Sequence, residues 1–219
     1  MEKPFVIALD GPAASGKGTL GRALADYYGF AYLDTGSLYR GVAWMLLNEG
    51  SDPHVPDVAE AAARRFSLGA IEGADIRTRE VGAAASVVAA EPRVRKALLD
   101  FQRGFAENPP GGAQGAILDG RDIGTVVCPE ATVKFFVQAS PDVRAHRRWL
   151  ELRPSRPGLT EDDVRADLAE RDARDAGRPD APMVAAADAE LLDTTHLDIG
   201  AAFAAARRVI DGVFRRCEG

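Results

Sequence analysis

The stretch Gly11–Thr19, GPAASGKGT, follows the apolar run Phe5–Leu9 (FVIAL) and opens a segment whose apolar residues recur at helical spacing. A glycine-rich turn between a strand and a helix points backbone N–H groups at an anion, and the helix dipole adds to the attraction. Gly11, Gly16 and Lys17 match the phosphate-binding pattern G-x-x-x-x-G-K-[ST]. The stretch therefore predicts a nucleotide-binding loop in which Lys17 reaches the outer phosphates.

One position of this loop departs from the general pattern. Gly18 stands where a hydroxyl residue is expected, and the hydroxyl follows one residue later at Thr19. We expect Mg²⁺ to be held through Thr19 or through water, with Asp119 as a second candidate ligand; a structural carboxylate is the alternative for Asp119. The residues predicted to contact the nucleotide are Gly11, Pro12, Ala13, Ala14, Ser15, Gly16, Lys17, Gly18 and Thr19.

Composition bounds the class of protein. The 219 residues are 46% hydrophobic and 27% charged, which is ordinary for a globular protein, and the net charge is −6 without a basic run, which argues against a nucleic-acid binder. The two cysteines and three histidines are scattered, so no zinc or redox spacing appears. With no signal peptide or membrane span in the pattern, we expect a cytoplasmic protein. We expect it to act on small phosphorylated ligands and to bind neither nucleic acid nor membrane.

Short apolar strands alternate with helical patterns along the chain. This order predicts an α/β fold with a five-stranded parallel sheet and helices on both faces. The expected strands are Phe5–Leu9, Phe30–Asp34, Ala116–Asp119, Val133–Val137 and Ala189–Asp193. The expected helices are Lys17–Tyr28, a helix from a turn at Gly36 to near Gly50, 57–66, 94–105, one capped by Ser140 before Pro141, one opened by a Thr160–Asp163 capping box, and 199–213.

Charged residues gather after strands and on one helix. Arg121 and Asp122 follow a buried strand, at the carboxyl edge where open sheets bind ligands, although a helix cap or an ion pair would also explain them. Arg171, Arg174, Asp175 and Arg178 are spaced i, i+3, i+4 and i+7 and would share one helical face. Spacing alone favours a solvated ion-pair face for these four.

Four further stretches narrow the class of nucleotide-binding protein. LDTGSLYR (Leu33–Arg40), IRTREVGAAASVVAAEPRVR (Ile76–Arg95), LDGRDIGTVVCPEA (Leu118–Ala131) and ERDARDAGR (Glu170–Arg178) follow the GKGT loop. Together, and in this order, they resemble cytidylate kinase of the bacterial type, a nucleoside-monophosphate kinase, from Phe5 to about Thr195. The resemblance implies a P-loop kinase fold with an acceptor-binding insertion and a lid. It also implies transfer of the γ-phosphoryl group of ATP to CMP and dCMP with Mg²⁺. We expect a monomer, although the sequence does not reveal the oligomeric state.

The resemblance also implies residue roles. It places Arg40 at the acceptor phosphate, and Ser86, Arg95 and Asp122 at the cytosine ring, where carboxylate and hydroxyl oxygens accept from N4 and arginine donates to N3 or O2. It places Arg171 and Asp175 near the ribose and Arg178 at phosphate. The implied CMP-binding set is Thr35, Arg40, Ser86, Arg95, Arg121, Asp122, Arg171, Asp175 and Arg178. The implied catalytic set is Lys17, Arg121, Arg171 and Arg178.

The chemistry agrees with an arginine-rich site. A phosphate acceptor is already a dianion near neutral pH, with a second pKa of about 6, so the reaction needs no general base. The obstacle is repulsion between two polyanions, which arginines and closure against water would reduce.

The resemblance divides the chain into three parts. The expected core is 1–34, 109–152 and 179–219, the acceptor-binding part is 35–108, and the lid is 153–178 with Arg153 and Arg156 as candidate ATP contacts. One departure stands out: the segment before Ile76 is short, so a hairpin usual in the family is expected to be reduced or lost.

Rival functions remain open from the sequence. A kinase for UMP or AMP would share the loop, and a substrate panel separates these. A GTP-binding switch predicts an N-K-x-D motif, but neither Asn48 nor Asn108 begins one. A structural P-loop protein would bind nucleotide without turnover.

Overall fold

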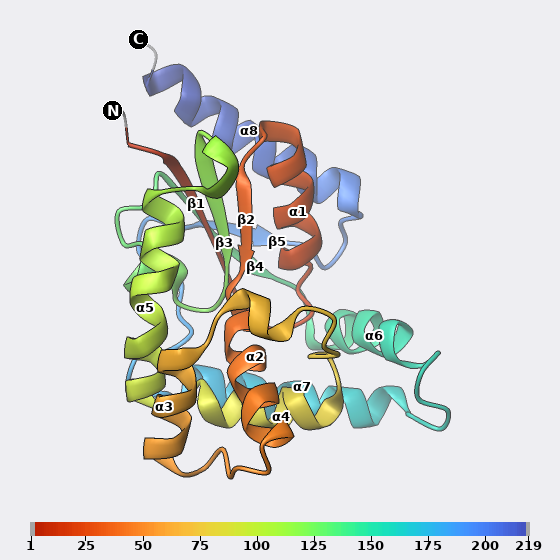
Figure 1. Ribbon diagram of the computed structural model, residues 1–219. Helices are drawn as coiled ribbons and strands as arrows, with labels where there is room; N and C mark the ends of the chain where they lie inside the picture. The colour runs from red at the N-terminus through yellow and green to blue at the C-terminus, as the bar shows by residue number, and fades with distance from the viewer. Residues whose placement is uncertain (1–2, 218–219) are drawn as a thin grey trace. The chain divides into compact units, whose positions relative to one another are not determined.

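A five-stranded sheet with strand order β2-β3-β1-β4-β5 organises the computed structural model, which describes residues 3–217 (Figure 1). The strands are β1 (Phe5–Asp10), β2 (Ala31–Asp34), β3 (Gly115–Asp119), β4 (Val133–Gln138) and β5 (Glu190–Asp193). The central strand β1 runs parallel to β3 and β4, with Phe5 opposite Gly115 and Ile7 opposite Val133. The strand β5 pairs in parallel with β4. The predicted parallel sheet is confirmed.

The chain forms two compact units. The sheet unit comprises Met1–Leu33 and Ala106–Gly219, and the insertion unit is the continuous segment Asp34–Phe105.

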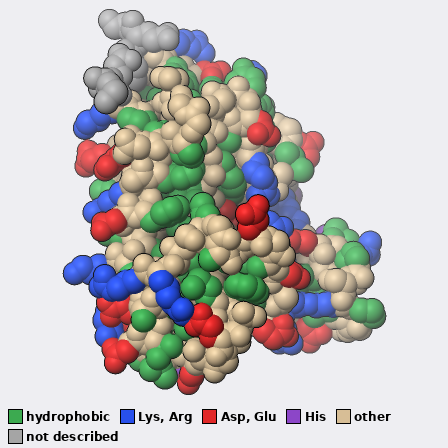
Figure 2. Space-filling view, in the orientation of Figure 1, with side chains coloured by type: hydrophobic (Ala, Val, Ile, Leu, Met, Phe, Trp, Pro, Cys, Tyr) green, Lys and Arg blue, Asp and Glu red, His purple; other side chains and the backbone are tan. Residues whose placement is uncertain are grey.

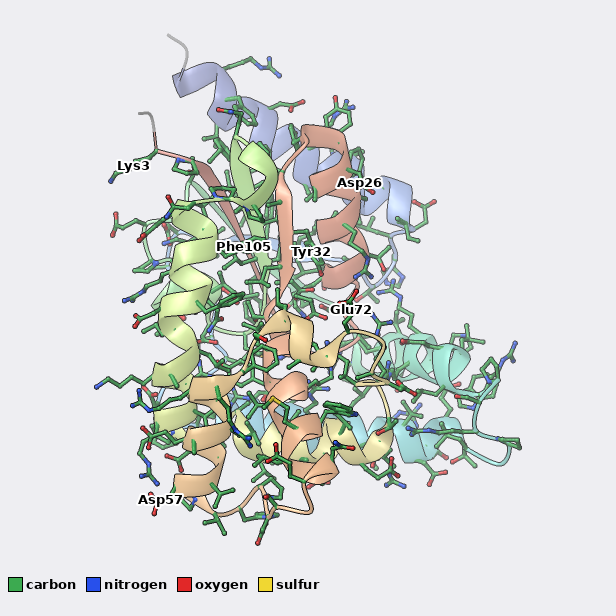
Figure 3. All side chains as sticks on the ribbon, viewed as in Figure 1. Lys3, Asp26, Tyr32, Asp57, Glu72 and Phe105 are labelled. Atoms are coloured by element: carbon green, nitrogen blue, oxygen red, sulfur yellow. The ribbon has the colours of Figure 1, made fainter. Side chains whose placement is uncertain are left out.

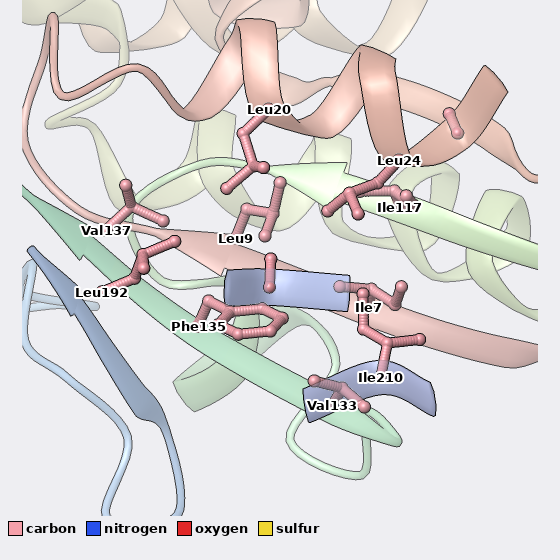
Figure 4. Close-up of a cluster of buried hydrophobic side chains, with 12 residues drawn as sticks. Ile7, Leu9, Leu20, Leu24, Ile117, Val133, Phe135, Val137, Leu192 and Ile210 are labelled. Carbon is pink, nitrogen blue, oxygen red and sulfur yellow. The ribbon is translucent and has the colours of Figure 1, made fainter. Parts of the chain in front are cut away.

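Two helices cover one face of the sheet. Alternation in β1 directs Ile7 and Leu9 to this face, where they meet α1 (Lys17–Tyr28) and α8 (Ile199–Cys217) around Phe135 (Figure 4). Full burial of each such side chain contributes roughly 1.5–3 kcal/mol. Because β1 leads straight into the glycine-rich loop, this packing fixes where the loop begins.

A helical hairpin of α6 (Pro141–Leu152) and α7 (Glu161–Ala176) lies beside the glycine-rich loop. The predicted caps are confirmed: Ser140 Oγ accepts from Val143 N at 3.4 Å, and Thr160 forms a capping box with Asp163. The two helices bury an apolar cluster of Ala13, Ala145, Val164 and Leu168. The loop residue Ala13 is thus part of the hairpin's own core.

The insertion unit is helical. It contains α2 (Thr35–Asn48), α3 (Pro56–Arg65), η1 (Leu68–Ile71), α4 (Arg79–Val88) and most of α5 (Pro92–Glu107). The expected turn at Gly36 is wrong, because Asp34 caps α2 by accepting from Ser37 N at 3.2 Å and the helix starts at Thr35. Helix α4, for which we expected no element, begins at the cap residue Thr78.

The segment 66–75, just before Ile76, contains no strand and includes the short turn η1. Phe66 packs against Gly41 instead, where a Cβ would lie 2.3 Å from the Phe66 ring. A glycine on α2 therefore lets an aromatic ring lie against the helix backbone.

On the face shown in Figure 2, acidic and basic side chains of the described residues are interspersed. No helix within residues 3–217 is both long and apolar enough to cross a membrane.

Candidate nucleotide site

The loop between β1 and α1 approaches the sheet most closely at Gly11. Its φ is +136°, and a Cβ there would lie 2.1 Å from the Val137 carbonyl oxygen. Gly16, with φ +95°, precedes the first residue of α1. Both motif glycines therefore adopt backbone geometry that other residues rarely reach, as the pattern predicts.

The carbonyl oxygens of the loop are bound by side chains. This arrangement suits an anion cradle, because a carbonyl oxygen that faced a bound phosphate would repel it. Lys17 Nζ donates to Pro12 O at 2.9 Å, Arg144 to Ala13 O at 3.2 Å, and Thr194 Oγ1 to Ser15 O at 2.9 Å.

Lys17 is almost entirely buried, with 5% of its surface exposed. Burial lowers the pKa of its ammonium to about 8, and the positive charge of Arg121 lowers it further, while Asp119 and Asp10 act in the opposite direction. Its Nζ lies 4.0 Å from Asp119 Oδ1. A bound phosphate would favour the charged form, so Lys17 has the surroundings of an anion ligand.

Asp119 ends β3 beside the loop. Tyr32 on β2, labelled in Figure 3, donates its hydroxyl to Asp119 Oδ2 at 3.1 Å. A Cβ on Gly18 would lie 3.4 Å from the same oxygen, whereas Thr19 is exposed. A side chain at position 18 would face this carboxylate, but this chain has glycine there. The Thr19 hydroxyl does not take that place.

Asp10 joins the glycine-rich loop to the segment that carries Arg121 and Asp122. Its carboxylate, 3% exposed, accepts from Ile123 N at 2.8 Å and Gly124 N at 2.7 Å. The short π-helical turn η3 (Ile123–Val127) is thereby anchored to the end of β1. Sequence reasoning missed this residue; the available signal was an acidic residue ending an otherwise apolar strand.

Asp10→Asn is expected to change how stability depends on pH. Burial raises the pKa of Asp10 from 3.8 to about 6, against the two backbone amides that favour the charged form. The folded state therefore holds the Asp10 proton up to a higher pH than the unfolded state does. The contribution of Asp10 to the free energy of unfolding is fully present below pH 3.8 and is lost as the pH rises through about 6. The loss is about 3 kcal/mol for this group.

Denaturant unfolding at pH 4, 5, 6 and 7 measures this effect. The stability of the wild type relative to Asp10→Asn should fall across that range, because asparagine does not titrate. The exposed Asp26→Asn on α1 is the matched control. A wild-type-to-variant difference that stays constant with pH would contradict the prediction.

Arg121 and Arg178 converge on Asp175, which is 2% exposed. Arg121 Nε donates to Asp175 Oδ2 at 2.9 Å, and Arg178 forms an ion pair with the other oxygen. Burial alone would raise the pKa of Asp175, but Arg121, Arg178 and Arg171 hold it below its ordinary value. The positive charges of Arg121 and Arg171 also lower the pKa of Lys17. The two arginines are therefore close enough to interact electrostatically with the phosphate loop.

The predicted single helical face from Arg171 to Arg178 is wrong. Helix α7 ends at Ala176, so Arg178 lies beyond it and reaches back to Asp175 from the following segment. Arg174 is exposed and pairs with Glu170 at 3.6 Å. The glycine at position 177 ends the helix, a stop signal that the spacing argument overlooked.

In the insertion unit, Arg40 is held by the helix cap. Arg40 donates to Asp34 Oδ2 at 2.6 Å, and its Nε is buried without a hydrogen-bond partner among the described residues. Thr35, the first residue of α2, is 3% exposed. The ion pair orients the Arg40 guanidinium and leaves its Nε–H without an acceptor among the described residues.

Ser86 on α4 and Arg95 on α5 are both buried, with exposures of 6% and 7%. Arg95 donates to Ala89 O at 3.3 Å and lies over the Tyr39 ring, 5.7 Å from its centroid. Ser86 Oγ has no hydrogen-bond partner within the described part of the chain. Polar groups left so in a protein interior are rare and point to a ligand or water.

The candidate residues therefore fall into two sets, one in each unit. The sheet unit holds Lys17, Asp119, Arg121, Asp122, Arg171, Asp175 and Arg178, and the insertion unit holds Thr35, Arg40, Ser86 and Arg95. Asp122 is 5% exposed, and its carbonyl accepts from Val126 N at 2.9 Å at the start of η3.

A glycine-rich strand–helix loop with a buried lysine, on a parallel sheet, defines a P-loop nucleotide-binding protein. A sequence model of the family described as cytidylate kinase matches residues 7–210. The chain belongs to the cytidylate kinase family, and so to the kinases.

Two relatives show how far the similarity extends. A cytidylate kinase from Rhodospirillum rubrum is 57% identical over 206 residues, which cover 94% of this chain and 97% of that one. One from Acidiphilium cryptum is 54% identical over 218 residues, covering 99% and 100%. In fold alone, the chain is similar to a solved structure of an uncharacterized protein from Eubacterium ventriosum, with TM-score 0.53, 11% identity, and coverage of 94% and 98%.

Proposed function

We propose that this chain transfers the γ-phosphoryl group of ATP to CMP and dCMP. The observation that carries the proposal is the cluster of fixed positive charges in the sheet unit: Lys17 beside the phosphate loop, and Arg121 and Arg178 held by Asp175. This cluster suits a reaction that must bring two polyanions together. Family membership, with relatives named cytidylate kinase, supports the nucleotide specificity.

In the proposed mechanism the acceptor phosphate attacks as a dianion and needs no general base. Lys17 and the loop amides bind the donor phosphates, while Arg121 and Arg178 neutralise the acceptor phosphate and the transferring group. Arg40, with its buried Nε, is a further acceptor-phosphate ligand. Arg171 and Asp175 contact the ribose, and Ser86, Arg95 and Asp122 read the cytosine ring, where the orphaned Ser86 hydroxyl supports such a contact.

The donor set is suited to Mg²⁺, which prefers carboxylate oxygens and keeps several waters. Asp119 supplies the carboxylate and would hold the ion through water; the exposed Thr19 is a candidate by its place in the loop only. When bound, the ion supplies charge neutralisation at the donor phosphates.

We further propose a cytoplasmic monomer that acts on small molecules, independent of nucleic acid and membrane. Sedimentation velocity tests whether the protein is a monomer in solution.

The test of function is ADP release with ATP–Mg²⁺ and each of CMP, dCMP, UMP, AMP and GMP. We expect kcat/KM for CMP and dCMP to exceed that for the other three. Preferred use of UMP or AMP would assign the chain to a different monophosphate, and nucleotide binding without turnover on any acceptor would reject the kinase.

Arg178→Ala is expected to raise KM for CMP by about 10–100-fold, the effect of losing a hydrogen bond to a charged group. The affinity for ATP should stay nearly unchanged. Arg174→Ala is the matched control, since Arg174 is exposed and its pairing with Glu170 contributes little. Equal CMP kinetics in the two variants would place Arg178 outside the acceptor site.

A further inference from the structure

Arg144 contacts three separate segments of the sheet unit. It lies in the first turn of α6 and is 7% exposed. Its Nε donates to Ala139 O at 3.1 Å, and one terminal nitrogen donates both to Ala13 O, at 3.2 Å, and to Asp172 Oδ2 on α7, at 2.5 Å. A single guanidinium therefore joins the phosphate loop to both helices of the hairpin.

The loop backbone needs support at this point. Ala14 has φ +60°, a left-handed conformation that costs a residue with a Cβ roughly 1–2 kcal/mol. Such a conformation persists only where its surroundings impose it. Arg144 binds the carbonyl that precedes Ala14, and the buried Ala13 methyl packs against Ala145, Val164 and Leu168.

The partner carboxylate lies on the helix that carries two acceptor-site candidates, Arg171 and Asp175. Asp172 follows Arg171 and precedes Asp175 on α7. Its second oxygen, Oδ1, is buried without a hydrogen-bond partner among the described residues, so its pairing depends on Arg144. The pair is largely buried, with side-chain exposures of 9% and 18%, so moving α7 away would leave the Arg144 charge poorly compensated.

We propose that Arg144 and Asp172 form a positioning pair that holds the phosphate loop in its binding conformation and couples it to α7. The loop then binds donor nucleotide best when α7 is in place, so donor and acceptor affinities depend on each other. This inference rests on the proposed function, because it takes the loop ligand to be ATP or ADP and the α7 ligand to be CMP. Neither residue touches the reacting groups in this proposal.

The experiment measures the Kd of ADP by calorimetry, with and without saturating CMP, for the wild type, Arg144→Lys, Asp172→Asn and the double variant. Lysine keeps the charge but cannot hold the same three acceptors. We expect each single variant to weaken ADP binding about tenfold. The double variant should bind ADP no more weakly than the weaker-binding single variant, because the effects of substituting two paired residues are not additive. The factor by which CMP changes the ADP Kd should shrink in all three.

Arg148→Gln is the matched control, since Arg148 is on the same helix and its pair with Glu151 is partly exposed. Unfolding midpoints are measured in parallel. Folded variants with lower midpoints but ADP Kd values within twofold of wild type would overturn the proposal and leave a structural pair. An unchanged Asp172→Asn beside a weakened Arg144→Lys would overturn the coupling to α7. A wild type that binds no ADP would reject the proposed function itself.

Discussion

Lys17→Ala is expected to lower kcat by a factor on the order of 10²–10³, the usual effect of losing one electrostatic contact to a transition state. The side chain is buried between the phosphate loop and Asp119, with its Nζ on Pro12 O at 2.9 Å. In the variant, nothing replaces that charge where negative charge accumulates on the transferring group. Because burial lowers the pKa of Lys17, deleting the side chain also removes a desolvation cost, so the fold should lose little stability.

The measurement pairs kcat with the melting temperature. Lys96→Ala, an exposed lysine on α5, is the control for loss of a lysine as such. Turnover close to wild type in Lys17→Ala would reject the assignment of the loop. A large fall in melting temperature with proportionate loss of activity would make Lys17 a structural residue.

Asp122→Asn is expected to lower kcat/KM for CMP by roughly 10–10³-fold while affecting UMP much less. The proposed contact is a hydrogen bond from cytosine N4 to the buried carboxylate. Uracil presents an acceptor, O4, at that edge, so the wild-type carboxylate would leave two acceptors facing each other. Sites built around a polar group reject a mismatch strongly. An amide can turn to offer a donor, so the CMP-to-UMP ratio should fall.

Parallel losses for CMP and UMP would mean that Asp122 is a scaffold or phosphate-side residue. Asp122 precedes the two amides that Asp10 binds, so a scaffold role would also appear as reduced stability. The exposed Asp26→Asn controls for the change of charge.

The fold was predictable to the extent that local patterns carried it. Strands buried on both faces are recognisable as continuous apolar runs. The starts of helices α6 and α7 are recognisable from their capping residues Ser140 and Thr160. The turn expected at Gly36 failed because Asp34, two residues earlier, caps α2 through its side chain. Glycine is a turn signal only where nothing nearby offers a helix start.

The site was predictable as a set of motifs rather than as contacts. Lys17 and Gly11 are readable from one loop, because the motif that identifies them lies within nine residues of sequence. Asp10 and Arg144 were missed because their partners are distant in sequence: Asp10 binds amides at positions 123 and 124, and Arg144 binds Ala13 and Asp172. Such contacts exist only once the sheet and the helical hairpin have formed.

The position of β1 at the centre of the sheet has a consequence for the order of events during synthesis. Phe5 pairs with Gly115, and at about 5–20 residues per second roughly 5–20 s of chain elongation separate the two. The insertion unit, Asp34–Phe105, is continuous and emerges from the ribosome before β3 does. It can therefore fold while β1 and the phosphate loop still lack their neighbours. During that interval the apolar Ile7 and Leu9 lack the side chains of β3, β4 and α8 that bury them in the folded protein.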